Sequence, residues 1–88
     1  MRVQAEISLY PLRTMELSPA INRFGNVLKG QGVTVVNGPM STIIGGEAKD
    51  VFRALEKAFS GVAEDSEVVM TCKVSNACPE APGGICKL

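Results

Sequence analysis

The spacing of apolar residues divides the chain into strand-like and helix-like stretches. In residues 2–10 apolar and polar side chains alternate, which is typical of a strand with one buried face. Three further stretches are short and rich in apolar or β-branched residues, and turn-forming residues separate them from their neighbours. The sequence therefore predicts strands at residues 2–10, 33–36, 41–45 and 67–75.

Two stretches between these strands carry apolar residues at helical spacing. Ser18 and Pro19 predict the start of the first helix, as a cap followed by proline in the first turn. Glu47 is expected to open the second helix, and Gly30 and Gly61 are expected to end the two helices. The predicted core-facing side chains are Ile21, Phe24, Val27 and Leu28 in the first helix and Val51, Leu55, Ala58 and Phe59 in the second.

The order strand, helix, strand, strand, helix, strand is that of a ferredoxin-like domain. Right-handed crossovers place both helices on the same face of one sheet. We therefore expect an α+β fold, a β-α-β-β-α-β sandwich with two helices on one face of a four-stranded antiparallel sheet. The predicted domain spans residues 1–76, and residues 77–88 form a C-terminal tail that contains proline, glycine and cysteine.

The other face of the sheet is expected to be open, because no helix covers it. Glu6, Ser8 and Tyr10 point toward this open face if the apolar residues between them face the helices. Lys73 points the same way if Cys72 faces the helices. Two interpretations of Glu6 then stay open: it forms a cross-strand ion pair with Lys73, or it accepts a hydrogen bond from an amine or ring nitrogen of a ligand.

The stretch NGPMSTIIGGE at residues 37–47 is the clearest candidate for a binding feature. Asn37-Gly38-Pro39 predicts a tight turn, since glycine accepts positive φ and proline fixes its own φ. Ser41 and Thr42 add hydroxyl groups where the next strand begins. Small polar side chains around a turn favour the binding of a small ligand over a nucleophile and its base.

Composition narrows the classes of function. The chain has 88 residues, nine basic and nine acidic, so its formal net charge is zero. Without a basic cluster, nucleic acid is not an expected partner. The apolar runs are too short to cross a bilayer and no apolar leader precedes the first strand, so we expect no membrane partner and a cytoplasmic location. Histidine, the commonest general base at neutral pH, is absent, and we expect the protein not to be an enzyme.

The three cysteines form no recognisable metal motif. An iron–sulfur cluster typically needs four thiolates, and the chain has three cysteines. Cys72 is expected to face the core as a small apolar residue. Cys78 and Cys86 lie in the tail at a spacing that matches no strong zinc pattern, so a metal, a disulfide and two thiols without a role all stay open. No metal and no cofactor are predicted.

Other functions of ferredoxin-like domains require residues that this chain does not have. An RNA-recognition module stacks bases on aromatic residues of its middle strands, and only Tyr10 is available there. A metal-transfer domain would place a Cys-x-x-Cys pair after the first strand, where no cysteine occurs. A small hydrolase would need an arginine cradle in the first loop. Arg13 lies in this loop, but Pro11 and Leu12 offer no glycine-rich nest of amides.

Three segments carry a resemblance to a known family. The stretches AEISLYPL, NGPMSTIIGGE and VVMTCKVSNACP resemble the thiamin- and hydroxymethylpyrimidine-binding YkoF-like family of small bacterial and archaeal proteins, over about residues 3–79. The resemblance implies a ferredoxin-like domain that pairs with a second copy, so that this single copy forms a homodimer or homotetramer. It also implies binding of thiamin or its pyrimidine precursor without known catalysis. The cysteine-containing tail departs from the family pattern.

An aminopyrimidine makes demands that the residues of this chain can meet. Its site needs a carboxylate or amide for the amine or ring, hydroxyls for the hydroxymethyl group, and apolar walls. No phosphate-binding glycine loop is present, which favours an unphosphorylated ligand. The alternative is a regulatory or interaction module whose open sheet face is only an oligomer interface. The predicted ligand-binding residues are Glu6, Ser8, Tyr10, Asn37, Met40, Ser41 and Thr42.

Overall fold

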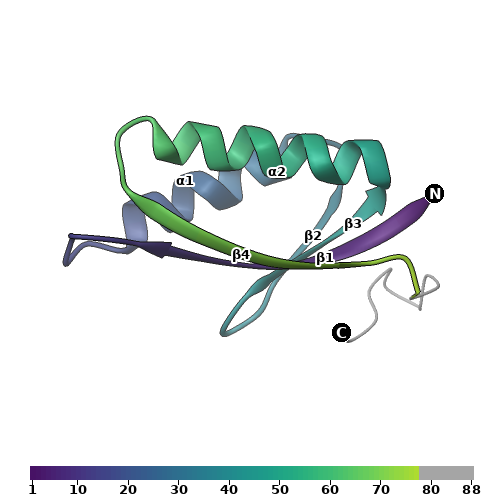
Figure 1. Cartoon of the computed structure of the whole chain (residues 1–88), viewed down its shortest axis with the longest axis horizontal. Helices are drawn as coiled ribbons and strands as arrows, with labels where there is room; N and C mark the ends of the chain where they lie inside the picture. Colours follow the sequence, from purple (N-terminus) through teal and green to yellow (C-terminus); the bar gives the residue numbers. More distant parts are fainter. Residues whose placement is uncertain (78–88) are drawn as a thin grey trace.

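The computed structural model describes residues 1–77, and it confirms the ferredoxin-like α+β fold. Both helices lie on one side of a twisted four-stranded sheet, and the other side carries no helix (Figure 1). Each strand begins and ends within two residues of its predicted bounds. The elements are β1 (Arg2–Pro11), α1 (Ser18–Lys29), β2 (Thr34–Asn37), β3 (Thr42–Glu47), α2 (Ala48–Ala63) and β4 (Val68–Ser75).

The sheet is antiparallel, with strand order β2-β3-β1-β4. Strand β1 lies in the middle, but its two neighbours cover different parts of it. Its pairing with β3 runs over residues 2–7 and stops at the pair Ile7–Thr42, whereas its pairing with β4 runs from Gln4 to Pro11. Residues 8–11 of β1, which we call the half-paired segment, therefore have a neighbouring strand on the β4 side only.

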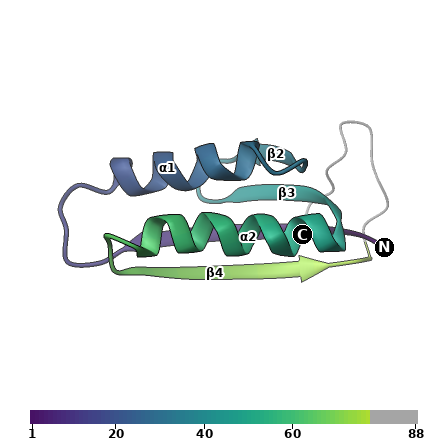
Figure 2. The ribbon, with the colours of Figure 1, turned by 90° about the horizontal axis from the view of Figure 1, so that it is seen from above.

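The core lies between the two helices and the covered face of the sheet. Seen from above, the two helices run side by side over this face (Figure 2). Strand β1 contributes Val3, Ala5 and Ile7 to this core. They are buried and point toward the helices, as the alternation in the sequence predicts. Burial of these apolar side chains is the main source of stability in such a small domain. The largest fully buried side chains are Ile7, Leu28, Ile44, Val51 and Val62.

Three details of the helices differ from the sequence-based expectation. Helix α1 begins at Ser18 itself, and its N-cap is Leu17, whose side chain makes no capping hydrogen bond. Helix α2 continues through Gly61 to Ala63, since glycine weakens a helix without necessarily ending it. Ile21 was expected in the core, but it is 44% exposed. It faces a cavity beside α1 instead.

The expectation for Cys72 is wrong. The register places Cys72 opposite Ile7, which is the helix side of the sheet, yet Cys72 is exposed with a free thiol. Strand β4 is an edge strand, and helix α2 covers only part of it. Val68 and Met70 of β4 pack against the core, whereas Val74 remains exposed. Cys78 and Cys86, and the tail predicted for residues 77–88 apart from Ala77, lie outside the described residues.

Neither helix within residues 1–77 is long and apolar enough to cross a membrane.

Candidate functional site

The predicted turn between β2 and β3 is present and tight. The Gly38 N–H donates to the Ser41 carbonyl oxygen at 2.8 Å, and a Cβ atom at Gly38 would stand only 3.0 Å from that oxygen. Glycine at this position therefore lets the turn close. At its base, the Thr42 hydroxyl donates to Asn37 Oδ1 at 3.2 Å, which holds the last side chain of β2 against the first of β3.

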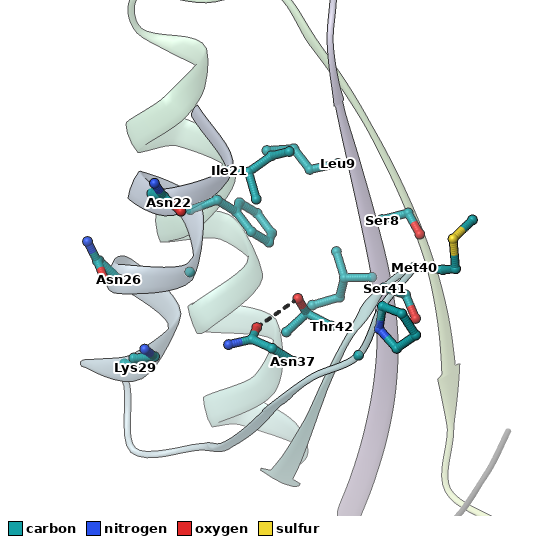
Figure 3. A pocket seen from close by; sticks show the side chains of 15 residues that line it. Ser8, Leu9, Ile21, Asn22, Asn26, Lys29, Asn37, Met40, Ser41 and Thr42 are labelled. Atoms are coloured by element: carbon teal, nitrogen blue, oxygen red, sulfur yellow. Dashed lines mark hydrogen bonds between the residues drawn. The ribbon is translucent and has the colours of Figure 1, made fainter. Parts of the chain in front are cut away.

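A cavity of about 340 Å³ opens beside the first residue of β3, where β1 continues with β4 as its only neighbouring strand. Its walls come from helix α1, from β1 at residues 7–9 and from the β2–β3 turn (Figure 3). Because β3 begins only at Thr42, no strand occupies the position beside the half-paired segment, and this space stays open. Five of the seven predicted ligand-binding residues line the cavity: Ser8, Asn37, Met40, Ser41 and Thr42.

These five residues approach the cavity from two faces of the sheet. Figure 3 shows Asn37 and Thr42 between β1 and α1, whereas Ser8, Met40 and Ser41 lie on the far side of β1 from that helix. The alternation of side chains explains the division, since Thr42 is opposite Ile7 and therefore on the helix side. The cavity is thus a notch at the end of the β1–β3 pairing that both faces of the sheet reach.

Glu6 lies behind this notch and does not line it. Its carboxylate accepts a hydrogen bond from the Ser41 hydroxyl at 3.2 Å and forms an ion pair with Lys73 Nζ at 3.2 Å. The hydrogen bond from Lys73, that from Ser41, and the positive charge of Lys73 lower the pKa of Glu6 below its ordinary value. The cross-strand pair with Lys73 is therefore present, and Glu6 is connected to the cavity through Ser41.

Tyr10, the remaining predicted residue, lies on the open face, outside the cavity. It is opposite Val69 of β4 and 53% exposed. Met40, at the tip of the turn, is 87% exposed. An exposed thioether beside a cavity is adaptable apolar surface, because methionine has three rotatable bonds and a polarisable sulfur.

Sequence reasoning did not identify the wall that α1 contributes. Asn22, Asn26 and Lys29 line the cavity from the exposed side of this helix, together with Ile21 (Figure 3). Gly25 belongs to the same wall. The signal was present in the sequence as polar residues three or four positions apart beside the apolar stripe. It was not read as a site because such residues usually form the solvated face of a helix.

A second cavity of about 420 Å³ lies at the other end of α1, and it holds none of the predicted site residues. Its two arginines are paired with carboxylates. Arg23 donates to both oxygens of Asp65 at 2.7 and 2.9 Å, and Arg13 contacts Glu67. Because each guanidinium has an acidic partner, this cavity offers an anion little uncompensated positive charge.

The chemistry of the first cavity is that of recognition by neutral groups. Amides and hydroxyls line it, with one lysine at its margin. Within residues 1–77 no group of three or more cysteine, aspartate or glutamate side chains is placed to hold a metal ion, and the chain contains no histidine.

The fold and the notch define a small ferredoxin-like domain with a polar cavity beside the β2–β3 turn. The YKOF-related family matches the sequence over residues 2–81, and the chain belongs to this family. No curated protein matches the sequence significantly.

Solved structures show the same fold. A hypothetical protein from Methanocaldococcus jannaschii is 26% identical, with a TM-score of 0.81 over 96% of this chain and 88% of that one. A Thermotoga maritima protein, described as a candidate thiamine biosynthesis/salvage protein, is 18% identical, with a TM-score of 0.78 over 98% of this chain and 90% of that one. A domain of unknown function from Bacillus cereus is 20% identical, with a TM-score of 0.75 over 85% of this chain and 75% of that one.

Proposed function

We propose that this protein binds a small molecule without chemical conversion, and that the ligand is thiamin or its hydroxymethylpyrimidine moiety. The observation that carries the proposal is the cavity at the end of the β1–β3 pairing, in a chain of the YKOF-related family. The description of the Thermotoga maritima protein, which shares the fold, points to the same class of ligand.

The size and lining of the cavity support a ligand of this kind. Its volume of about 340 Å³ lies within the range of roughly 300–1,000 Å³ that is typical of small-molecule sites. An aminopyrimidine carries an amine donor and ring-nitrogen acceptors. The side-chain amides of Asn22, Asn26 and Asn37 each offer both a donor and an acceptor, so they can pair with either kind of group.

In this proposal Ser41 and Thr42 contact the ligand, and Glu6 acts through Ser41. The Glu6 carboxylate already accepts from Lys73 and Ser41, so its role is to orient the Ser41 hydroxyl. Met40 closes over the apolar part of the ligand, because its exposed side chain is free to repack there. Tyr10 belongs to the open face of the sheet and has no part in the cavity wall.

We further propose that the bound form is unphosphorylated. Phosphate is held in many proteins by glycine-rich loops whose amides point at it, followed by a lysine and a hydroxyl residue. The glycines at the cavity, Gly25 and Gly38, form no such loop, since one lies within α1 and the other in a turn closed on Ser41.

Calorimetric titration tests the proposal directly. The purified protein is titrated with thiamin, with hydroxymethylpyrimidine and with thiamin pyrophosphate, and its melting temperature is followed with each compound. Binding of the first two should raise the melting temperature with concentration, since a ligand that binds only the folded state stabilises it. Absence of binding by both compounds would overturn the assignment of the ligand.

A second function is favoured by a separate observation on the open face. Tyr10, Val36 and Val69 are each more than 40% exposed there, around the Glu6–Lys73 ion pair. We propose that a second copy of the chain covers this face, in a dimer or tetramer. If the protein oligomerises but binds none of the three compounds, the interaction module is the better description. Sedimentation at micromolar concentration measures the association.

A further inference from the structure

The half-paired segment of β1 presents backbone hydrogen-bonding groups to the cavity at Leu9. The Leu12 N–H donates to the Glu67 carbonyl at 2.8 Å, which sets the phase of the ladder between β1 and β4. Backbone groups in an antiparallel strand alternate between its two neighbours. The even-numbered residues of β1 from Gln4 onward therefore bond to β4, and the odd-numbered ones, up to Ile7, bond to β3.

Leu9 is the next odd-numbered residue, and β3 does not reach it. Its N–H and C=O both point to the β3 side, where the register within residues 1–77 supplies no partner strand. Leu9 lines the cavity, and the residues of the β2–β3 turn that also line it lie on the same side of β1 as this donor and this acceptor. Pro11 follows two residues later on the same side, and it has no N–H to leave unpaired.

A second observation, on the opposite wall, concerns Gly25 in the middle of α1. Ile21 and Lys29 lie one helical turn before and after it, and both also line the cavity. Gly25 thus occupies the centre of the helix face that the cavity exposes. The centre of this helix face is therefore occupied by a glycine, which has no side chain.

Neither the backbone nor the packing of α1 requires glycine at position 25. Its φ is not positive, and an added Cβ atom would meet no atom within 4 Å. Glycine inside a helix is also destabilising relative to alanine. What the glycine provides is space at the cavity wall, which allows a ligand to approach the helix closely.

We propose that Leu9 and Gly25 form a slot for a flat heteroaromatic ring that carries an amino group next to a ring nitrogen. The ring nitrogen accepts from the Leu9 N–H, and the amino group donates to the Leu9 C=O. The face of the ring lies against the surface of α1 at Gly25. This inference rests on the proposed function for its ligand class, and it names the groups that read the ring.

The first experiment compares two glycines that both lie in helices. Gly25→Ala places a methyl group in the slot. Gly61→Ala is the matched control, because Gly61 lies in α2 away from the cavity and its added methyl would make an ordinary contact of 4.0 Å with Val27. Gly25→Leu is the stronger version of the same change, since it places a whole leucine side chain in the slot.

Both alanine variants should fold at least as well as the parent. The melting temperature should rise by about 2–8 °C for Gly25→Ala and by less for Gly61→Ala, which lies in the last turn of its helix. Only Gly25→Ala should weaken binding of hydroxymethylpyrimidine, by about 10- to 200-fold, the usual effect of one carbon atom too many in a fitted pocket. Gain of stability together with loss of binding is a result that mere structural damage does not give.

The second experiment tests the Leu9 backbone through the ligand. Replacing the amino group of the pyrimidine by an oxo group turns the donor into an acceptor and the neighbouring ring nitrogen into a donor. Binding to the parent should fall at least about tenfold for each Leu9 group left unpaired. In parallel, hydrogen exchange of the Leu9 amide should slow on addition of the aminopyrimidine, and exchange of the already paired Ile7 amide should not change by the same factor.

Adenine, which has the same pair of ring nitrogen and amino group, separates this inference from the proposed function. If adenine binds in a Gly25-dependent manner and thiamin compounds do not, the slot stands and the thiamin assignment falls. If hydroxymethylpyrimidine binds the parent and Gly25→Leu equally well, or binds without slowing Leu9 exchange, the slot is wrong and the function stands. If neither class of ring binds, both are overturned.

Discussion

The two halves of strand β1 have the same alternating sequence but different surroundings. Residues 2–7 are paired with β3, and from Gln4 onward also with β4, and the apolar side chains Val3, Ala5 and Ile7 are at most 8% exposed. Residues 8–11 have β4 on one side only, and Leu9 and Pro11 are partly exposed. One half is a central strand of the core, whereas the other is an edge that borders a cavity.

The difference follows from the length of β3 and not from β1 itself. The turn closes with the hydrogen bond between Gly38 and Ser41, and β3 begins directly after it, at Thr42. Two residues more in β3 would have paired Leu9 and filled the notch. The domain thus keeps its stability in the first half of β1 and leaves peptide groups accessible in the second. An unpaired strand edge is an aggregation hazard, so keeping one so short limits the risk.

Hydrogen exchange should show the largest difference between the two halves. Amides of central strands exchange only through openings that approach global unfolding, while unpaired amides exchange almost freely. In the ligand-free protein we expect the Ile7 amide to exchange orders of magnitude more slowly than the Leu9 amide. Measurement by NMR at one pH gives both rates. Equal protection of the two amides would mean that the two halves of β1 are not different in this way.

Truncation of side chains should show the next largest effect. Ile7 is 2% exposed and Leu9 is only partly buried. Ile7→Ala should lower the free energy of unfolding by about 2–5 kcal/mol. Leu9→Ala should lower it by about 1–2 kcal/mol, since less apolar area is lost from the core. Denaturant titration measures both values. A larger loss for Leu9→Ala would place the core farther along β1 than the structure does.

The fold could be predicted from the sequence because each element carries a local signal. The alternation in β1, the apolar stripes of the helices and the turn dipeptides are consistent with one set of strands and helices. The order of these elements is that of the ferredoxin-like topology. The ends of the helices were less certain. Ser18 and Gly61 have the usual preferences for helix ends, but such preferences are weak against tertiary packing.

The site could be predicted only in part, because it depends on register. The turn at Asn37 was visible in the sequence. The position of the last β1–β3 pair, Ile7–Thr42, was not, and this position decides where the cavity opens. Without this register the cavity could not be foreseen, and Gly25 and Asn26 of α1, which line it, were missed for the same reason. Cys72 was misassigned because alternation gives the face of a strand and does not reveal that β4 lies at the edge.

Tyr10 provides the next test, on the open face of the half-paired segment. If a second copy covers this face, Tyr10 lies within the interface, where large aromatic residues often dominate binding. Tyr10→Lys should then weaken association by about 30-fold or more, while the fold is retained because Tyr10 is 53% exposed in the single chain. Sedimentation over a range of concentrations tests this. A parent protein that is monomeric at micromolar concentration would contradict the proposed interface.

Thr42, the first residue of β3 and the partner of Ile7, should give a smaller effect on ligand binding. Thr42→Val keeps the shape of the side chain and removes the hydroxyl that donates to Asn37 Oδ1. A neutral hydrogen bond contributes about 0.5–1.5 kcal/mol, so the Kd for hydroxymethylpyrimidine should rise about 3- to 10-fold. Thr34→Val, on the exposed edge strand β2, is the matched control and should leave the Kd unchanged. Equal Kd values for both variants would remove Thr42 from the site.

The smallest expected effect is the pH dependence that Glu6 confers on stability. The hydrogen bond and the charge of Lys73 lower the pKa of folded Glu6 below its ordinary value of 4.5. A carboxylate with a lowered pKa stabilises the folded state above its unfolded pKa, and this contribution is lost as the pH falls through the folded pKa. The parent should therefore be slightly more stable than Glu6→Gln at pH 7, and the difference should disappear toward pH 3.

The Lys73→Met background sharpens this test. Without the lysine, the main cause of the lowered pKa is removed, and the pH dependence of the Glu6→Gln effect on stability should shrink to the part that Ser41 maintains. Denaturant titrations of the four proteins at several pH values give the coupling. If the Glu6→Gln effect is independent of pH with Lys73 present, the ion pair on the open face adds nothing to stability, and only the connection of Glu6 to Ser41 remains to explain its position beside the notch.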